Sequence, residues 1–301
     1  RVFDHPFLEP SARVGAESLA IPEDAWIPLP PGAKMAVLPG RSPIGLDPAT
    51  GAAERFDGGN IGGTRIRANA VGAILPPAFV RLHIPAYRAR TIAPALSQWA
   101  YTAVAMRGDR AYAAAFRLDA RTRWDPRHFS EAALKRAAAI RASEFPGNRL
   151  IAQVTKCALE YACVTSQNIL LRRNEGALPV SVTCNAECLG CLSLVPPGGA
   201  PSSHERVRRL PTADEIADVA TLHLKAARRP MVSFGQGCEG EPLVAAPLIE
   251  DAIRKIRTST KRGRINMNTN GSISAAVERL IEAGLDHIRV SLSSARESLY
   301  T

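Results

Sequence analysis

Residues 182–192 read VTCNAECLGCL and directly follow an apolar segment, 178–183, that predicts a β-strand. Cys184, Cys188 and Cys191 therefore form a C-x3-C-x2-C motif on the loop after this strand. In parallel α/β folds, ligands bind at the carboxyl ends of the strands, so the motif lies where a site is expected.

The chain on the C-terminal side of the motif repeats strand, loop and helix. The predicted strands are 178–183, 231–235, 264–269 and 287–292, and the predicted helices are 212–228, 244–260 and 274–283. Apolar strands separated by helices of this length require right-handed parallel crossovers. Residues 178–301 are therefore predicted to form an α/β domain with an open or barrel-like parallel sheet.

The region before the motif has a different pattern. Residues 1–177 are rich in Pro, Gly and short β patterns, and predict a β-rich α+β domain of unknown role. Residues 99–107 and 110–118 predict a hairpin, because Gly108 at the first turn position suits a type II′ turn. Ser130 predicts the N-cap of a helix that runs to about residue 143.

Composition limits the class of protein. The chain has 301 residues, of which 46% are hydrophobic and 22% charged, so it is neither disordered nor a coiled coil. Apolar runs fall far short of the roughly 20 residues of a membrane span, and no membrane association is expected. The net charge of +10 comes from scattered side chains, so nucleic-acid binding is a minor alternative that stays open.

The cysteines indicate a metal rather than disulfides. Three of the 6 cysteines fall within the motif, a density that favours metal binding in a reducing compartment, and we expect a cytoplasmic protein. Three thiolates can hold three irons of a 4Fe-4S cubane and leave the fourth iron open for a ligand. A zinc site with His204 or another cysteine as fourth ligand is the alternative, as is a fully ligated electron-transfer cluster.

The motif and its position after the first strand resemble the radical SAM superfamily, whose signature is C-x3-C-x-aromatic-C. The resemblance covers residues 178–301 and implies a partial TIM-type (β/α) parallel barrel. With four strands present, the barrel is expected to be truncated at the C-terminus of this chain. Gly190 stands where the family usually has an aromatic side chain, and its backbone is the candidate contact there.

The resemblance also implies contacts for S-adenosylmethionine. Residues 233–243, SFGQGCEGEPL, are similar to the family's Gly-Gly-Glu-Pro element, which receives the ammonium group of this cofactor. Gly240 and Glu241 are the leading candidates, and Glu239 is a second carboxylate. Glycine lets a backbone approach a ligand closely, and a carboxylate complements a cationic amine.

Two further strand ends resemble family segments. Residues 266–272, NMNTNGS, favour Asn268 as a site residue, ahead of Asn270. Residues 287–295, HIRVSLSSA, make Ser291 the candidate for the ribose or carboxylate of the cofactor, with Ser293 and Arg289 as secondary candidates.

The resemblance implies an enzyme. An external one-electron reductant of the flavodoxin or ferredoxin type would reduce the cluster, and S-adenosylmethionine would be cleaved to a 5′-deoxyadenosyl radical that abstracts hydrogen from an unknown substrate. The alternatives are an iron-sulfur electron-transfer or binding module and a zinc-structured interaction protein.

The other three cysteines have no familiar spacing. Cys157 and Cys163 are interpreted as packed thiols, with an auxiliary cluster as the alternative. Cys238 lies in the loop after the second strand, where a radical relay, a second-cluster ligand or a packed thiol are all compatible with its position.

Overall fold

The computed structural model describes residues 5, 7–61, 64–121, 123, 125–195, 197, 199–292 and 294–299. The chain divides into two compact units, Arg1–His128 and Phe129–Thr301. The division falls well before the predicted boundary at 177/178. The reason is that the helices that follow residue 129 share one hydrophobic core with the parallel sheet.

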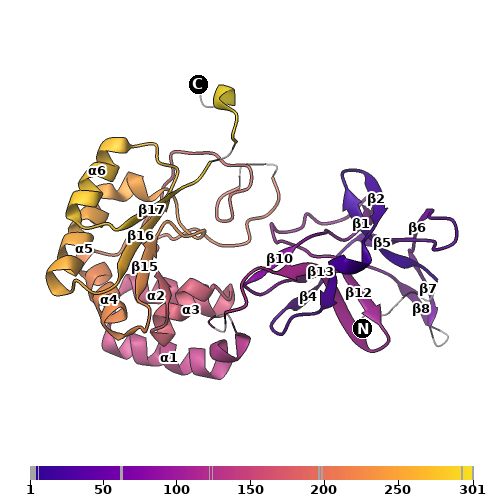
Figure 1. Ribbon diagram of the computed structural model, residues 1–301, viewed down its shortest axis with the longest axis horizontal. Coiled ribbons are helices and arrows are strands. Elements are labelled where there is room, and N and C mark those ends of the chain that lie inside the picture. The colour runs from indigo at the N-terminus through magenta and orange to yellow at the C-terminus, as the bar shows by residue number, and fades with distance from the viewer. Residues whose placement is uncertain are drawn as a thin grey trace. The chain divides into compact units, whose positions relative to one another are not determined.

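The first unit is built from antiparallel strands (Figure 1). One sheet has the order β11-β5-β1-β2, with β6 on β5, and a second has the order β10-β13-β12, with β3 on β13. The pairs β4-β9 and β7-β8 complete it. The strands are β1 (Glu9–Val14), β2 (Glu17–Ala20), β3 (Trp26–Pro28), β4 (Lys34–Leu38), β5 (Arg41–Leu46), β6 (Ala53–Arg55), β7 (Gly58–Ile61), β8 (Thr64–Arg67), β9 (Ala70–Ile74), β10 (Phe79–Arg81), β11 (Tyr87–Ala89), β12 (Val104–Arg107) and β13 (Arg110–Arg117).

The predicted hairpin of this unit is confirmed, although its first strand begins later than expected. β12 and β13 pair with Arg107 opposite Arg110, so Gly108 and Asp109 form a two-residue turn. Gly108 has φ +57°, a value that glycine adopts without strain.

The second unit contains six α-helices among the described residues. They are α1 (Glu131–Glu144), α2 (Arg149–Glu160), α3 (Val164–Leu171), α4 (Ala213–Ala226), α5 (Ala246–Ser259) and α6 (Ser274–Ala283). The N-cap of α1 is Ser130, as predicted, and Thr212 and Glu215 form the predicted capping box of α4. Helices α2 and α3 were not predicted, although the Asn148 side chain caps α2 by accepting a hydrogen bond from the Ile151 N–H.

One parallel sheet lies at the centre of this unit. Its strands are β14 (Glu175–Ala177), β15 (Met231–Phe234), β16 (Arg264–Thr269) and β17 (His287–Val290), in the order β14-β15-β16-β17. The last three strands confirm the predictions to within two residues. The chain as a whole is therefore mixed α/β, with antiparallel sheets in one unit and a parallel sheet in the other.

The first strand lies earlier than the predicted range 178–183. The N–H groups of Val180 and Ser181 donate to the Glu239 carboxylate instead of to a neighbouring strand, and Pro179 has no N–H to donate. β-Sheet pairing therefore stops close to Ala177, and the following residues run as an extended segment towards the cysteine loop.

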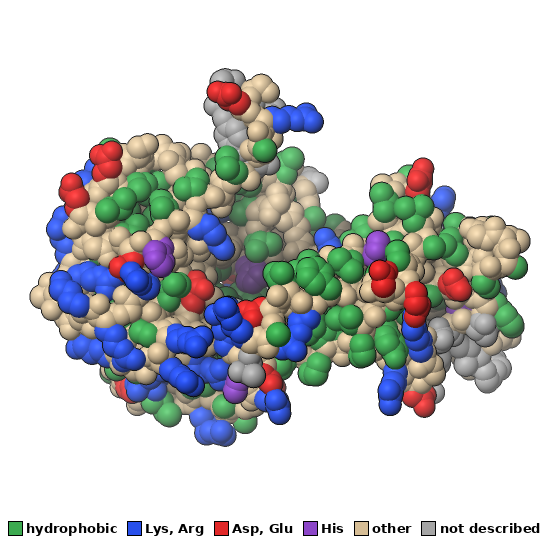
Figure 2. Space-filling view, in the orientation of Figure 1, with side chains coloured by type: hydrophobic (Ala, Val, Ile, Leu, Met, Phe, Trp, Pro, Cys, Tyr) green, Lys and Arg blue, Asp and Glu red, His purple; other side chains and the backbone are tan. Residues whose placement is uncertain are grey.

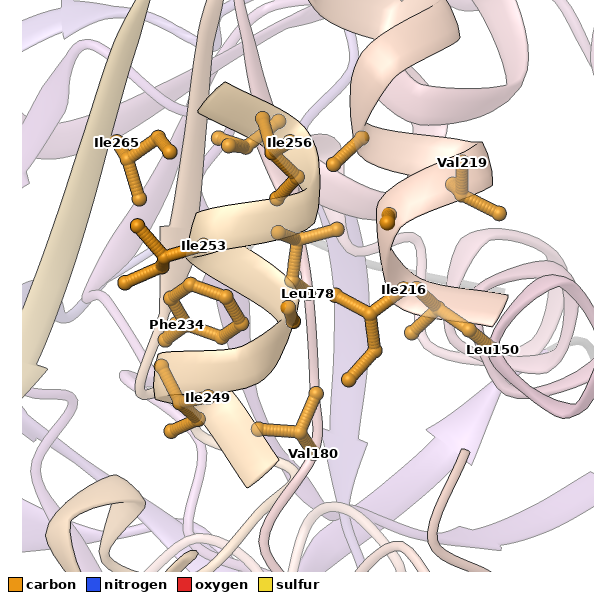
Figure 3. Close-up of a cluster of buried hydrophobic side chains, with 14 of the residues drawn as sticks. Leu150, Leu178, Val180, Ile216, Val219, Phe234, Ile249, Ile253, Ile256 and Ile265 are labelled. Atoms are coloured by element: carbon orange, nitrogen blue, oxygen red, sulfur yellow. The ribbon is translucent and has the colours of Figure 1, made fainter. Parts of the chain in front are cut away.

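Helices α4, α5 and α6 lie side by side along the sheet (Figure 1), with direct contacts between α4 and α5 and between α5 and α6. Their apolar stripes meet the strands in one buried core. Figure 3 shows Ile249, Ile253 and Ile256 of α5 beside Phe234 of β15. Burial of such side chains contributes about 1.5–3 kcal/mol each, so this core holds the helices on the sheet.

None of the described helices is both long enough and apolar enough to cross a lipid bilayer. On the face shown in Figure 2, Lys and Arg side chains gather over the helical part of the second unit, interspersed with fewer acidic side chains.

Candidate metal and cofactor site

Three loops meet at the carboxyl edge of the parallel sheet. The Gly240 N–H donates to the Ser181 carbonyl at 2.7 Å, and the Glu241 N–H donates to the Thr183 carbonyl at 2.9 Å. These bonds join the loop after β15 to the segment that leads into the cysteine motif. The motif is thereby held next to the second strand end.

The third loop is joined through Asn185, a residue of the motif itself. Its Oδ1 accepts a hydrogen bond from Asn270 Nδ2 at 2.9 Å, and its Nδ2 donates to Ser272 Oγ at 2.8 Å. The turn after β16 thus also contacts the cysteine loop. The sequence pattern favours Asn268 ahead of Asn270 and gives no indication of Asn185.

Gly240 allows a very close approach of two loops in the site. A Cβ at this position would lie 1.8 Å from the Thr183 carbonyl oxygen. No side chain fits there, so glycine is required for the two loops to meet. Gly240 is buried, and its carbonyl accepts no hydrogen bond from the described residues.

The Glu241 carboxylate is buried and bound to the protein. Its Oε1 accepts hydrogen bonds from the Thr269 hydroxyl and the Leu243 N–H, and its Oε2 accepts one from the Asn270 N–H at 2.8 Å. Glu241 therefore joins the end of β15 to the end of β16. Its carboxylate positions the two loops.

Glu239 is buried as well. Its Oε2 accepts from the N–H groups of Val180 and Ser181 at 2.7 and 2.8 Å, and its Oε1 accepts from the Gln236 N–H at 2.7 Å. Burial raises the pKa of Glu239 to about 7, although these hydrogen bonds act in the opposite direction. The side chain predicted as a second cofactor carboxylate points into the protein and fixes the start of the cysteine loop.

The remaining predicted contacts lie on neighbouring strand ends. Asn268 Nδ2 donates to the Gly235 carbonyl at 3.1 Å, so this amide shapes the loop after β15. Ser291 follows β17, is exposed, and its N–H donates to the Thr269 carbonyl at 2.8 Å. Arg289 is exposed on β17, whereas Ser293 lies outside the described residues.

The three thiols of the motif differ in exposure: Cys188 is exposed, and Cys184 and Cys191 are half-buried. Cys191 Sγ accepts a hydrogen bond from the Leu194 N–H at 3.3 Å and one from Arg206 Nη2 at 3.5 Å. Burial alone would raise its pKa, but hydrogen bonds from Ser193 and Leu194 and the charge of Arg206 outweigh burial and lower the pKa of Cys191. The chain thus stabilises the thiolate form, which is the form that binds metals.

The three thiols of the motif lie on one loop. Among the described residues, no three His, Cys, Asp or Glu side chains lie close enough together to hold one ion. The donor set itself fits an iron-sulfur cluster, because three thiols lie on one loop at a strand edge and the pKa of Cys191 is lowered.

Gly190 has room around it. A Cβ there would meet nothing within 4 Å, in contrast to Gly240. The position has room for an added side chain.

His204, the alternative zinc ligand, lies beside the cysteine loop. Its N–H donates to the Leu192 carbonyl at 3.0 Å, its ring packs against Tyr161 at 4.7 Å, and burial lowers its pKa. Its Nδ1 is 3.0 Å from the hydroxyl of Ser203. The ring does not join a metal-binding group with the described thiols.

Arg206 links the site to a neighbouring cavity that sequence reasoning missed. The cavity has a volume of about 720 Å³ and lies between α1, α2 and residues 205–209. Arg206 lines it and also binds Ser193 Oγ and Cys191 Sγ. Because Arg206 lies in an irregular segment, no periodicity could have assigned it to the site.

Comparison of the chain with protein-family models, with curated proteins and with solved structures finds no significant match.

Proposed function

We propose that this chain is a radical SAM enzyme. The observation that carries the proposal is the attachment of one three-cysteine loop to two neighbouring strand ends, through Gly240 and through Asn185. The location of three thiols and several polar side chains at one strand edge is typical of a ligand site.

Two features of the second unit favour a partial TIM-type barrel over a doubly wound sheet. The strands follow one another in sequence order from β14 to β17. Helices α4, α5 and α6 contact one another in a row, so they cover the same side of the sheet. Both features are expected of a (β/α) barrel, whereas doubly wound sheets reverse their strand order and carry helices on both faces.

In this proposal, Cys184, Cys188 and Cys191 hold a 4Fe-4S cluster, and Arg206 lowers the cost of placing a thiolate at Cys191. The bound cluster, with S-adenosylmethionine on its open iron, would supply one-electron cleavage of the sulfonium carbon-sulfur bond, the chemistry that begins hydrogen abstraction from a substrate. The chain holds the thiolates, excludes water and orients both partners.

The groups that would orient S-adenosylmethionine are inferred from their hydrogen-bonding capacity and their position. The Gly240 carbonyl is an acceptor for the ammonium group, and the carboxylates of Glu241 and Glu239 hold the backbone around that carbonyl in place. The exposed Ser291 hydroxyl is the candidate contact on the fourth strand, and the Gly190 backbone is the candidate contact for the adenine.

The partners follow from the chemistry. The cluster requires an external one-electron reductant of the flavodoxin or ferredoxin type and a reducing compartment, which we propose is the cytoplasm. The basic surface of the second unit suits an acidic electron donor (Figure 2).

Anaerobic reconstitution with iron and sulfide, followed by electron paramagnetic resonance, tests the proposal. The reduced protein should show a 4Fe-4S signal that changes when S-adenosylmethionine is added, and it should release 5′-deoxyadenosine. Cys188→Ala should lose both, whereas the matched control Cys163→Ala should retain the signal.

Other outcomes contradict the proposal in distinguishable ways. A cluster whose four irons are all held by the protein, with no 5′-deoxyadenosine, indicates an electron-transfer module. A colourless protein that retains zinc indicates a structural zinc site.

A further inference from the structure

A cavity lies beside the cysteine loop, and the proposed function does not use it. Its volume is about 720 Å³, within the range of about 300–1,000 Å³ that is common for small-molecule sites. Helices α1 and α2, which contact each other, and the segment 205–209 line it. All of these elements belong to the second unit. The cavity is therefore a candidate site for a small organic molecule.

One part of the lining is apolar and has short side chains. Ala142 of α1 and Ala152 of α2 are exposed there, and the half-buried Phe145 lies at the end of α1. Alanine leaves the space between the helices open, and an aromatic ring offers a flat apolar surface for packing. This part of the cavity favours a ligand with an aromatic group, because a free inorganic anion would gain nothing from it.

The segment 206–209 makes another part of the lining basic. Arg206, Arg208 and Arg209 all line the cavity. Val207 between them is 3% exposed, and its N–H donates to the carbonyl of the buried Cys238 at 2.8 Å. The backbone that carries the three arginines is thus anchored to the protein interior.

The remaining charges of the lining are largely neutralised by ion pairs. The Glu205 carboxylate is 2.7 Å from Lys156 Nζ and 3.7 Å from Arg208 Nη2. Arg149 Nη2 is 2.8 Å from Glu215 Oε2. The positive charge that is left for a ligand therefore comes mainly from the segment 206–209.

The three arginines retain N–H groups for an anion. Arg206 donates through Nε to Ser193 Oγ and through Nη2 to Cys191 Sγ, which leaves Nη1. The Arg208 side chain is 82% exposed, and Arg209 is exposed without a hydrogen bond or ion pair to the described residues. Planar guanidinium groups bind phosphate oxygens in pairs, and the three terminal oxygens of a phosphate monoester can accept from several of them at once. A carboxylate has two oxygens and satisfies fewer of them.

We propose that this cavity binds a small aromatic phosphate. Its phosphate lies on Arg206, Arg208 and Arg209, and its aromatic group packs between α1 and α2 beside Phe145. Because Arg206 also binds Cys191, the ligand lies close to the cysteine loop. Binding requires no iron-sulfur cluster, so failure of this proposal leaves the proposed function untouched.

Isothermal titration calorimetry of the full chain, freed of metal, tests the site at fixed ionic strength. The probe is 1-naphthyl phosphate, and the matched probes 1-naphthol and inorganic phosphate each lack one half of it. 1-Naphthyl phosphate should bind at least about tenfold more tightly than either, because only it uses both parts of the lining. Adenosine 5′-monophosphate then identifies the source of the ligand: tighter binding than that of 1-naphthyl phosphate indicates a nucleotide, and weaker binding indicates another aryl phosphate.

Two pairs of neighbouring arginines separate the site from the overall charge of the protein. Arg208→Gln with Arg209→Gln should weaken binding of 1-naphthyl phosphate at least about tenfold, because two charged donors are lost. Arg228 and Arg229 are exposed and lie outside the lining. Arg228→Gln with Arg229→Gln should therefore change the affinity less than about twofold.

Alanine-to-leucine substitutions test the apolar part of the lining. Ala142→Leu with Ala152→Leu fills the space between the helices, and both positions are exposed, so the fold should be retained. Binding of 1-naphthyl phosphate should weaken at least about tenfold, whereas the affinity for inorganic phosphate should not change. Ala132→Leu, on α1 but outside the lining, is the control.

Three results would overturn the proposal. One is the absence of saturable binding of 1-naphthyl phosphate up to about 1 mM. Another is an equal affinity for 1-naphthol or for inorganic phosphate, which excludes a site that needs both parts of the lining. The third is equal weakening by the two arginine pairs at unchanged melting temperature, which shows that net charge alone attracts the probe.

Discussion

Gly240 and Thr183 approach so closely that a Cβ on Gly240 would lie 1.8 Å from the Thr183 carbonyl oxygen. This contact places the cysteine loop against the end of β15. Replacing Gly240 with Ala should push the two segments apart, because neither backbone can yield without losing the hydrogen bonds of Gly240 and Glu241. We expect a loss of about 2 kcal/mol in unfolding free energy by urea titration, together with reduced iron binding.

Gly190→Ala is the matched control for that variant. The added methyl group would meet nothing within 4 Å, so stability and iron content should both stay unchanged. Equal losses in the two variants would show that the effect of Gly240→Ala does not come from the contact with Thr183.

The buried Glu239 predicts a pH dependence of stability. Its pKa is raised from 4.5 in the unfolded chain to about 7 in the folded protein. The folded state therefore binds more protons in this range, and the resulting stabilisation is complete below pH 4.5 and is lost as the pH rises to about 7. The contribution amounts to about 3 kcal/mol, measurable by urea titration at several pH values.

Glu239→Gln should flatten this dependence. The amide has one acceptor oxygen, so the N–H groups of Gln236, Val180 and Ser181 cannot all be satisfied, and the variant should lose about 1–3 kcal/mol at pH 5. A variant that retained the full slope between pH 4.5 and 7 would assign the titration to another group.

Glu215, unlike Glu239, should make the folded protein less stable as the pH falls. It closes the capping box of α4 and binds Arg149 of α2, and despite the opposing effect of burial these hydrogen bonds lower its pKa to about 2. The contribution of the ionised Glu215 to the stability of the folded protein is present above pH 4.5 and is lost as the pH falls towards 2. Glu215→Gln should reduce the acid sensitivity of unfolding, whereas Asp218→Asn on the exposed face of α4 should not.

The hydrogen bonds of Asn185 should slow local opening of the cysteine loop. Asn185→Ala removes the hydrogen bonds to Asn270 and Ser272, so amide hydrogen exchange in residues 183–188 should become faster. Exchange in β15 should stay unchanged. If both segments exchange faster, the substitution has loosened the sheet and not the loop alone.

Much of the second unit could be predicted from periodicity and capping signals. Thr212 with Glu215, and Gly284 at φ +116°, mark the boundaries of α4 and α6 as expected. Helix α2 was missed although Asn148 caps it, because Pro- and Gly-rich neighbours suggested a β-rich region.

Other features depend on tertiary contacts that no pattern encodes. β14 ends close to residue 177 because the Glu239 side chain, distant in sequence, takes the N–H groups that would have extended it. The same residue was predicted to face a ligand, because its sequence neighbourhood does not reveal that it is buried. Arg206 and Asn185 reach the loop from positions with no local signal.

The cysteine loop is hydrogen-bonded to neighbouring segments at its start and at its end, and its central residues are exposed. Asn185 secures one end and Cys191 the other, while Cys188 and Gly190 are exposed. On ligand binding, the exposed central residues are therefore expected to lose the most conformational entropy. Mutations of the exposed central residues should change the association and dissociation rates of the ligand. The hydrogen-bonded ends of the loop should determine the position of the ligand.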